Sequence, residues 1–124
     1  MATGIENLIV FQKSFRLAMD IFEYSKEFPK EERYSLTDQI RRSSRSVSAN
    51  LAEAYRKRKY TAHFLSKLSD ADMENTETFV WLKFCISCRY LTNKDCESLI
   101  ERNREIGRMI DHMINHPEKF QRNW

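Results

Sequence analysis

Hydrophobic residues along the chain recur at intervals of three and four positions, the spacing that gathers side chains on one face of an α-helix. The first such stripe consists of Leu8, Phe11, Phe15, Ala18, Phe22 and Ser25. It is followed by Phe28 and Pro29, and a residue before proline is pushed out of the α conformation. We therefore predict a first helix over residues 8–28 that packs through its phenylalanines.

A second helix is predicted over residues 36–57. Its core positions are Leu36, Ile40, Ser44, Val47, Leu51 and Ala54. The hydroxyl of Ser35 is placed to cap its first turn, and Asp38 stands three residues on, where a capping box carries an acidic residue. Ser35 is thus the expected start of this helix.

Two further helices follow the same rules, over residues 61–89 and 93–115. The later one has Thr92 or Asn93 as its cap, and Pro117 ends it. Four helices joined by short connections predict an all-α fold, an antiparallel up-down-up-down four-helix bundle. Residues 117–124 are expected to form a loose tail.

Composition fits a single domain over residues 1–124. The chain is 41% hydrophobic, and it has only two glycines and two prolines, too few for a many-turned β protein. We find no leader sequence and no apolar stretch long enough for a membrane span, so we expect a soluble cytoplasmic protein with no membrane contact. The odd cysteine count, three, suits reduced thiols in a cytosol.

Charge is distributed unevenly. Residues 33–59 hold eight Lys or Arg against two Asp or Glu, although the whole chain has a net charge of only +3. Clustered cations bind phosphates and release counterions, so this segment predicts contacts to RNA or DNA. The candidate nucleic-acid-binding residues are Arg41, Arg42, Arg45, Arg56, Lys57, Arg58 and Lys59. Alternatively, Arg41 and Arg45 pair with acids of a neighbouring helix or subunit, and residues 56–59 only complement a helix dipole.

Small residues mark a second face of the second helix, beside the core stripe. Serine and alanine let another backbone approach closely, so this face predicts a helix-packing or subunit contact; the alternative is that the alanines are ordinary surface residues. Asn50 and Glu53 flank the core, where they need polar partners, and we expect them to fix the register between helices. The candidate contact residues are Ser48, Ala49, Asn50, Ala52 and Glu53.

Catalytic patterns are absent from the sequence. The serines of the second helix have no histidine or lysine at a telling interval, and the carboxylates form no Glu-x-x-His pair of di-iron bundles. Cys85, Cys88 and Cys96 resemble part of a zinc site without a fourth ligand, and whether they bind metal stays open. We expect no enzyme activity, no resident metal, no cofactor and no small-molecule substrate.

Several ordered motifs together resemble one family, the four-helix bundle proteins encoded within intervening sequences of bacterial 23S ribosomal RNA genes. The motifs are Leu8-Ile9-Val10-Phe11-Gln12-Lys13, Phe28-Pro29-x-x-Glu32, Leu36-Thr37-x-Gln39-Ile40-Arg41-Arg42, Ser46-Val47-x-x-Asn50-Leu51-Ala52-Glu53-Ala54 and Trp81-Leu82. They span residues 8–113. Family members often carry Glu-Gly where this chain has Glu53 and Ala54.

The resemblance implies a ring-like homopentamer of four-helix protomers with a role in binding RNA. Accessory variability proteins of diversity-generating retroelements are similar in architecture. Together with the basic segment, the resemblance leads us to expect a non-enzymatic, oligomeric protein that binds RNA or another nucleic acid. The alternative is a protein-interaction adaptor whose basic segment docks an acidic protein partner.

Overall fold

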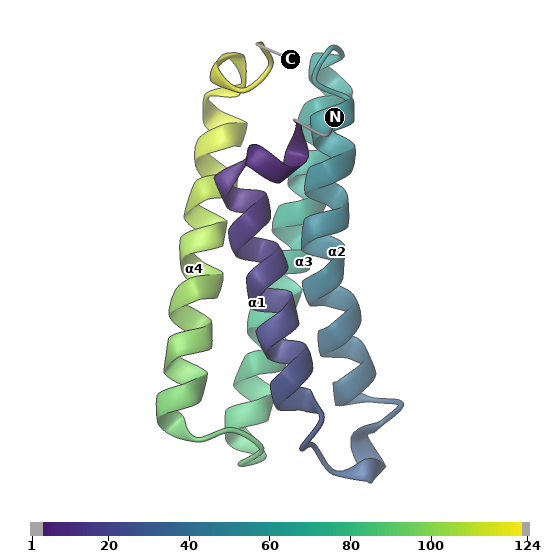
Figure 1. Ribbon diagram of the computed structural model, residues 1–124, viewed down its shortest axis with the longest axis vertical. Coiled ribbons are helices and arrows are strands. Elements are labelled where there is room, and N and C mark those ends of the chain that lie inside the picture. Colours follow the sequence, from purple (N-terminus) through teal and green to yellow (C-terminus); the bar gives the residue numbers. More distant parts are fainter. Residues whose placement is uncertain (1–3, 123–124) are drawn as a thin grey trace.

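A computed structural model describes residues 4–122, and every regular element in that range is helical. The four long helices are α1 (Ile9–Ser25), α2 (Leu36–Arg56), α3 (Thr61–Ser87) and α4 (Asn93–Asn115). They alternate in direction, and each packs on its two neighbours in a closed square (Figure 1). The antiparallel up-down-up-down four-helix bundle is confirmed, and the predicted helix ends lie within three residues of the observed ones.

Three short 3-10 turns complete the elements of the described range: η1 (Ile5–Asn7), η2 (Lys30–Glu32) and η3 (Pro117–Lys119). No helix among residues 4–122 combines the length and apolar character that crossing a membrane requires.

The core-facing side of α1 differs from the prediction. Its buried residues are Val10, Ser14, Leu17, Ala18, Ile21 and Ser25. Phe15, expected in the core, is 55% exposed, and Phe11 and Phe22 are only partly buried. Two adjacent stripes of α1 satisfy the three-and-four spacing, and the less bulky one faces inward because serines of α2 bring the two helices close. Phe22 lies against Arg41 and Arg45 of α2, and the rings of Phe11 and Phe15 pack on each other with centres 6.0 Å apart.

The start of α2 also differs from the prediction. Ser35 makes no capping hydrogen bond to the helix. Instead, the carboxylate of Glu32 accepts the Leu36 amide at 3.2 Å and the Ser35 hydroxyl. Glu32 therefore supplies the cap that the sequence pattern assigned to Ser35.

Buried polar pairs tie each helix to the next. They join α1 to α2, α2 to α3 and α3 to α4, with distances of 2.8 to 2.9 Å. The pairs are Ser14 with Ser48, Ser43 with Thr78, and Asn75 with Asn103. Because buried polar groups need their partners, these pairs favour one register of the bundle.

The C-terminal segment is better ordered than the loose tail that we expected. After η3, the amide of Gln121 donates to the backbone oxygen of Arg58 and to the hydroxyl of Thr61, both at 2.9 Å. The segment is thus fastened to the turn between α2 and α3. Trp124, at the end of the expected tail, lies outside the described residues.

Candidate nucleic-acid interface

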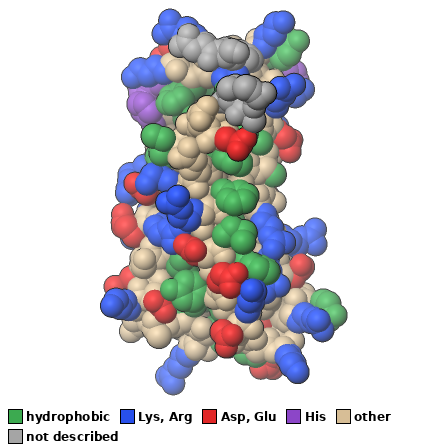
Figure 2. Space-filling view, viewed as in Figure 1, with side chains coloured by type: hydrophobic (Ala, Val, Ile, Leu, Met, Phe, Trp, Pro, Cys, Tyr) green, Lys and Arg blue, Asp and Glu red, His purple; other side chains and the backbone are tan. Residues whose placement is uncertain are grey.

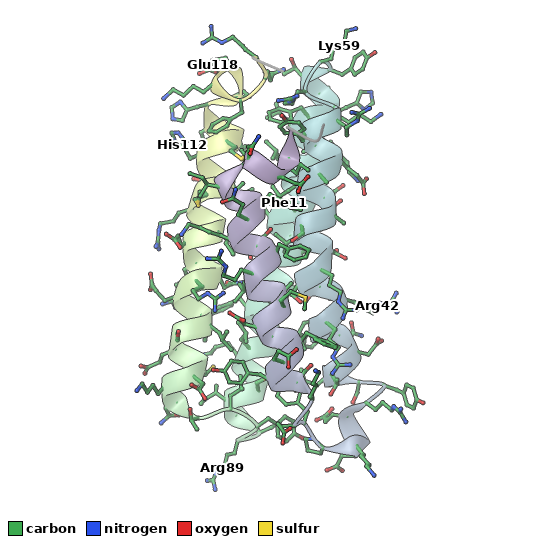
Figure 3. The ribbon with its side chains drawn as sticks, viewed as in Figure 1. Phe11, Arg42, Lys59, Arg89, His112 and Glu118 are labelled. Atoms are coloured by element: carbon green, nitrogen blue, oxygen red, sulfur yellow. The ribbon has the colours of Figure 1, made fainter. Side chains whose placement is uncertain are left out.

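The predicted cations fall into two groups along α2. Arg41, Arg42 and Arg45 belong to its first half, whereas residues 56–59 form its end and the following turn. At 1.5 Å per residue, about 16 Å separates Arg45 from Arg56. Figure 3 shows the two levels at Arg42 and Lys59. The basic segment of the sequence therefore forms two separate surfaces.

The first group is arranged around an aromatic ring of α1. The guanidinium groups of Arg41 and Arg45 lie 4.7 and 5.4 Å from the ring centre of Phe22. Arg42 is 75% exposed and lies 3.7 Å from Asp38 on the same helix, a surface pair that contributes little to stability. No carboxylate of α3 among residues 4–122 pairs with this group. Pairing of Arg41 or Arg45 with a neighbouring subunit stays a prediction.

The second group contains one buried member. Arg58 is only 7% exposed; its guanidinium lies 3.4 Å from the ring centre of Tyr55, and its Nε donates to the Tyr55 carbonyl. Arg56, Lys57 and Lys59 are exposed. Arg58 thus packs the turn, and its three neighbours present their charges to solvent.

The C-terminal segment adds charges to this second group. The hydrogen bonds of Gln121 bring exposed Lys119 and Arg122 to the same end of the molecule. Figure 2 shows Lys, Arg and His side chains at this upper end. We call Arg56, Lys57, Lys59, Lys119 and Arg122 the basic end. Sequence analysis missed Lys119 and Arg122, because only the fold brings residues some 60 positions apart together.

Histidines stand beside the basic end. The rings of His112 on α4 and of His116, the residue that follows α4, have centres 4.6 Å from each other, and His112 packs edge to face on Phe120 at 5.8 Å. One acidic residue, Glu118, also projects at this end (Figure 3).

The predicted contact residues play different parts. Ser48 is buried and bonds to Ser14 of α1, Ala49 is exposed, and Ala52 is half-buried. Glu53 accepts from Lys67 of α3 at 2.9 Å, so it does link two helices. The amide of Asn50 donates to the Ser46 carbonyl of its own helix, a bond that fixes no register between helices.

Apolar side chains reach solvent on two faces. On α1, Phe15 and Met19 are 55% and 43% exposed and line a surface hollow of about 620 Å³ beside Arg16. On the diagonal helix α3, Met73 and Phe84 are 66% and 52% exposed. Contiguous exposed apolar patches are typical of contact surfaces, whereas single exposed apolar side chains are ordinary. The hollow is lined by α1 and the turn before it, whereas the small-residue face predicted from the sequence lies on α2, the helix packed beside α1.

The cysteines do not assemble a ligand set. Cys85 and Cys96 are buried and Cys88 is exposed, and burial raises the pKa of the Cys85 thiol to about 12. A thiol with so high a pKa remains protonated at neutral pH, the form that binds metal poorly. Residues 4–122 contain no group of three or more His, Cys, Asp or Glu side chains placed to hold an ion.

Comparison with known proteins gives the chain a family. A crystal structure of a protein of unknown function from the S23 ribosomal protein family of Bacteroides thetaiotaomicron is 31% identical, with a TM-score of 0.79, and the match covers 86% of this chain and 96% of that one. Among curated proteins, none matches the sequence. Residues 6–112 match the family described as 23S rRNA-intervening sequence protein, as the motifs predicted. This chain therefore belongs to the 23S rRNA-intervening sequence protein family.

Proposed function

We propose that this protein is a non-enzymatic, oligomeric nucleic-acid-binding protein of the cytoplasm that binds RNA at its basic end. The supporting observation is the convergence of five exposed cations from two distant segments at one end of the bundle. Such groups neutralise phosphates and release the counterions around them. The family description refers to 23S rRNA, which makes RNA the first ligand to test. Exposed Arg42 and Arg45, with half-buried Arg41, are additional contacts along α2.

Binding to RNA should weaken steeply as salt is raised. The logarithm of the binding constant falls linearly with the logarithm of the salt concentration, and each neutralised phosphate adds about 0.7 to 0.9 to the steepness of that line. Neutralising the turn with Arg56→Gln, Lys57→Gln and Lys59→Gln should reduce that slope by about two to three. The melting temperature should stay the same because these side chains are exposed. Fluorescence anisotropy with a labelled RNA, titrated at several chloride concentrations, measures both quantities.

A matched control removes the same charge elsewhere. Lys83, Arg89 and Lys94 are exposed at the opposite end, near the connection of α3 to α4 (Figure 3). Their triple replacement by glutamine should leave the salt slope unchanged. A flat salt response of the natural protein, or an equal loss in both triple variants, contradicts binding at the basic end.

Oligomer formation is the second part of the proposal. The exposed side chains of Phe15 and Met19 give α1 an apolar surface that suits a second copy of the chain. The family resemblance implies a pentamer. Repetition of the basic end around such a ring would multiply the field that attracts RNA.

The alternative function is a protein-interaction adaptor that docks an acidic protein partner on the same cations. Arg56, Lys57 and Lys59 form no ion pair with carboxylates of residues 4–122, which leaves them available to either partner. A pull-down with and without nuclease separates the two functions. Partners that disappear after nuclease treatment favour nucleic acid, and protein partners that persist favour the adaptor.

A further inference from the structure

A cationic hollow lies at the other end of α2, where α1 connects to α2. It has a volume of about 490 Å³. Its lining consists of Ser25, Lys26, Phe28, Pro29, Lys30, Arg33, Thr37 and Arg41. Four of these residues are cationic and none is acidic. We call this hollow the loop pocket; Arg41 is its one lining residue among the candidate nucleic-acid-binding residues predicted from the sequence.

Arg41 is held in a defined orientation at the pocket. Its Nε donates to the hydroxyl of Ser25 at 2.7 Å, and that hydroxyl in turn donates to the Phe22 carbonyl at 2.7 Å. The guanidinium plane is further supported by the Phe22 ring. A guanidinium carries five N–H donors, and Nε uses one. No carboxylate of the described range forms an ion pair with Arg41, so its terminal nitrogens are prepared for an anion from outside.

Thr37 supplies an independent indication of a ligand. Its side chain is 7% exposed, and its hydroxyl is buried with no hydrogen-bond partner among residues 4–122. A buried hydroxyl without a partner costs free energy, and native proteins rarely keep one. Thr37 is also the second residue of α2, in the turn where the helix dipole favours negative charge. A ligand that is anionic and accepts hydrogen bonds would suit both the Thr37 hydroxyl and the cationic lining.

The other cations of the pocket are only weakly engaged. Lys26 lies 3.1 Å from Glu23, an exposed pair one turn back on α1. Arg33 stacks on the exposed ring of Tyr34 at 5.6 Å. Lys30 and Arg33 are exposed and can turn toward a ligand. An anion in the pocket would thus meet one fixed cation and up to three movable ones.

We propose that the loop pocket binds a phosphate group, with Arg41, Lys30, Arg33 and the Thr37 hydroxyl as donors to its oxygens. The pocket is larger than a phosphate ion and one wall is apolar, formed by Phe28 and Pro29, so it also accommodates part of an attached organic group. The ligand class is phosphate, free or esterified. When a nucleic acid supplies the phosphate, this inference rests on the proposed function; binding of free phosphate does not.

The decisive variant is Thr37→Val, which removes the hydroxyl and keeps the shape of the side chain. Without phosphate it should melt at the same temperature as the natural protein or higher, because an unpartnered buried hydroxyl is lost. Its affinity for inorganic phosphate should fall about fivefold, the equivalent of one hydrogen bond. Isothermal titration calorimetry at constant ionic strength, with chloride as the balancing anion, measures the change.

A second variant keeps the test independent of Thr37. Lys30→Gln with Arg33→Gln should weaken phosphate binding further, whereas the matched pair Arg89→Gln with Lys94→Gln, on the neighbouring connection, should leave it unchanged. Absence of phosphate binding by the natural protein, or affinities of the Thr37 and Lys30/Arg33 variants that equal that of the natural protein, overturns the proposal.

Two RNA oligonucleotides, one with a 5′-phosphate and one with a 5′-hydroxyl, identify the source of the phosphate. A preference for the 5′-phosphate that is lost in Thr37→Val assigns the pocket to nucleic-acid ends. Phosphate binding without such a preference assigns it to free phosphate or a small ester. If RNA binding fails altogether and phosphate still binds, the proposed function is overturned and the pocket stands.

Discussion

At the scale of single residues, Glu32 joins more of the structure than any pattern in the sequence indicated. Its carboxylate accepts the Ser35 hydroxyl, the Leu36 amide and, at 2.8 Å, the Tyr90 hydroxyl from the connection of α3 to α4. The bond from Ser35, followed by those from Tyr90 and Leu36, holds the pKa of Glu32 below its ordinary value of 4.5. One ionised side chain therefore fastens two connections at the same end of the bundle.

This depressed pKa predicts how stability depends on pH. Below pH 4.5 the unfolded chain takes up a proton at Glu32 before the folded chain does, so the unfolding free energy falls as pH drops toward the folded pKa. Above pH 4.5 the contribution of Glu32 is fully present. Glu32→Gln should be less stable at pH 7 by about 1 kcal/mol, the value of a helix cap, and its difference from the natural protein should shrink with acid. Urea unfolding at pH 7 and pH 3.5 measures both, and a constant difference contradicts the assignment.

The capping error has a physical origin. In a capping box, a serine at the helix start is followed three positions later by an acidic residue, and Ser35 with Asp38 has this spacing. In the structure the acid comes first, and Glu32 reaches forward from η2 to the helix. The start of α2 was predictable to the residue, because Leu36 begins its apolar stripe. The chemistry of the cap was not, because η2 is a turn whose direction depends on the packing of Tyr90.

At the scale of elements, α1 shows that hydrophobic periodicity predicts where a helix forms but not which face of it is buried. Proline, spacing and apolar content predicted all four helices. They did not identify which stripe of α1 faces inward, because Phe11, Phe15 and Phe22 appeared to be better core residues than Val10 and Leu17. The choice was decided by the partner helix. Ser44 and Ser48 of α2 are small and buried, so the contact of α1 with α2 is too close for large rings.

Two alanine substitutions test this assignment. Leu17→Ala should lower the unfolding free energy by about 2 to 5 kcal/mol, because it opens a cavity beside a side chain that is 3% exposed. Phe15→Ala should cost less than about 1 kcal/mol in dilute protein, because the ring is already half in solvent. Urea unfolding followed by circular dichroism gives both values. The reverse order would restore the phenylalanine stripe to the core.

At the scale of the whole molecule, the candidate binding surfaces lie on different parts of the bundle. The basic end and the loop pocket lie at opposite ends of α2, and the apolar surface of α1 lies between them along the side. The cations of α2 could be read from the sequence. The loop pocket could not, because it combines the end of α1, η2 and the first turns of α2. Lys119 and Arg122 join the basic end only through tertiary contacts.

The apolar surface of α1 predicts a change in assembly. Phe15→Glu should lower the oligomer mass measured by light scattering without lowering helix content, because a carboxylate replaces an exposed ring at the proposed contact between copies. Met73→Glu, on the exposed face of α3, is the matched control and should leave the mass unchanged. A natural protein that is monomeric contradicts the proposed oligomer, and a change caused only by Met73→Glu places the contact on α3.

The buried polar pairs that link neighbouring helices hold those helices in one register relative to each other. A slip by one helical turn would break the bonds of Ser14, Thr78 and Asn103 and leave their groups unpaired in the core, so the helices cannot slide. The basic end and the loop pocket, at opposite ends of α2, therefore stay about 30 Å apart, the length of a 21-residue helix. A nucleic acid that contacted both sites would have to span this fixed distance. A DNA duplex bound in this way would need about nine base pairs, and a shorter duplex could contact only one of the two sites.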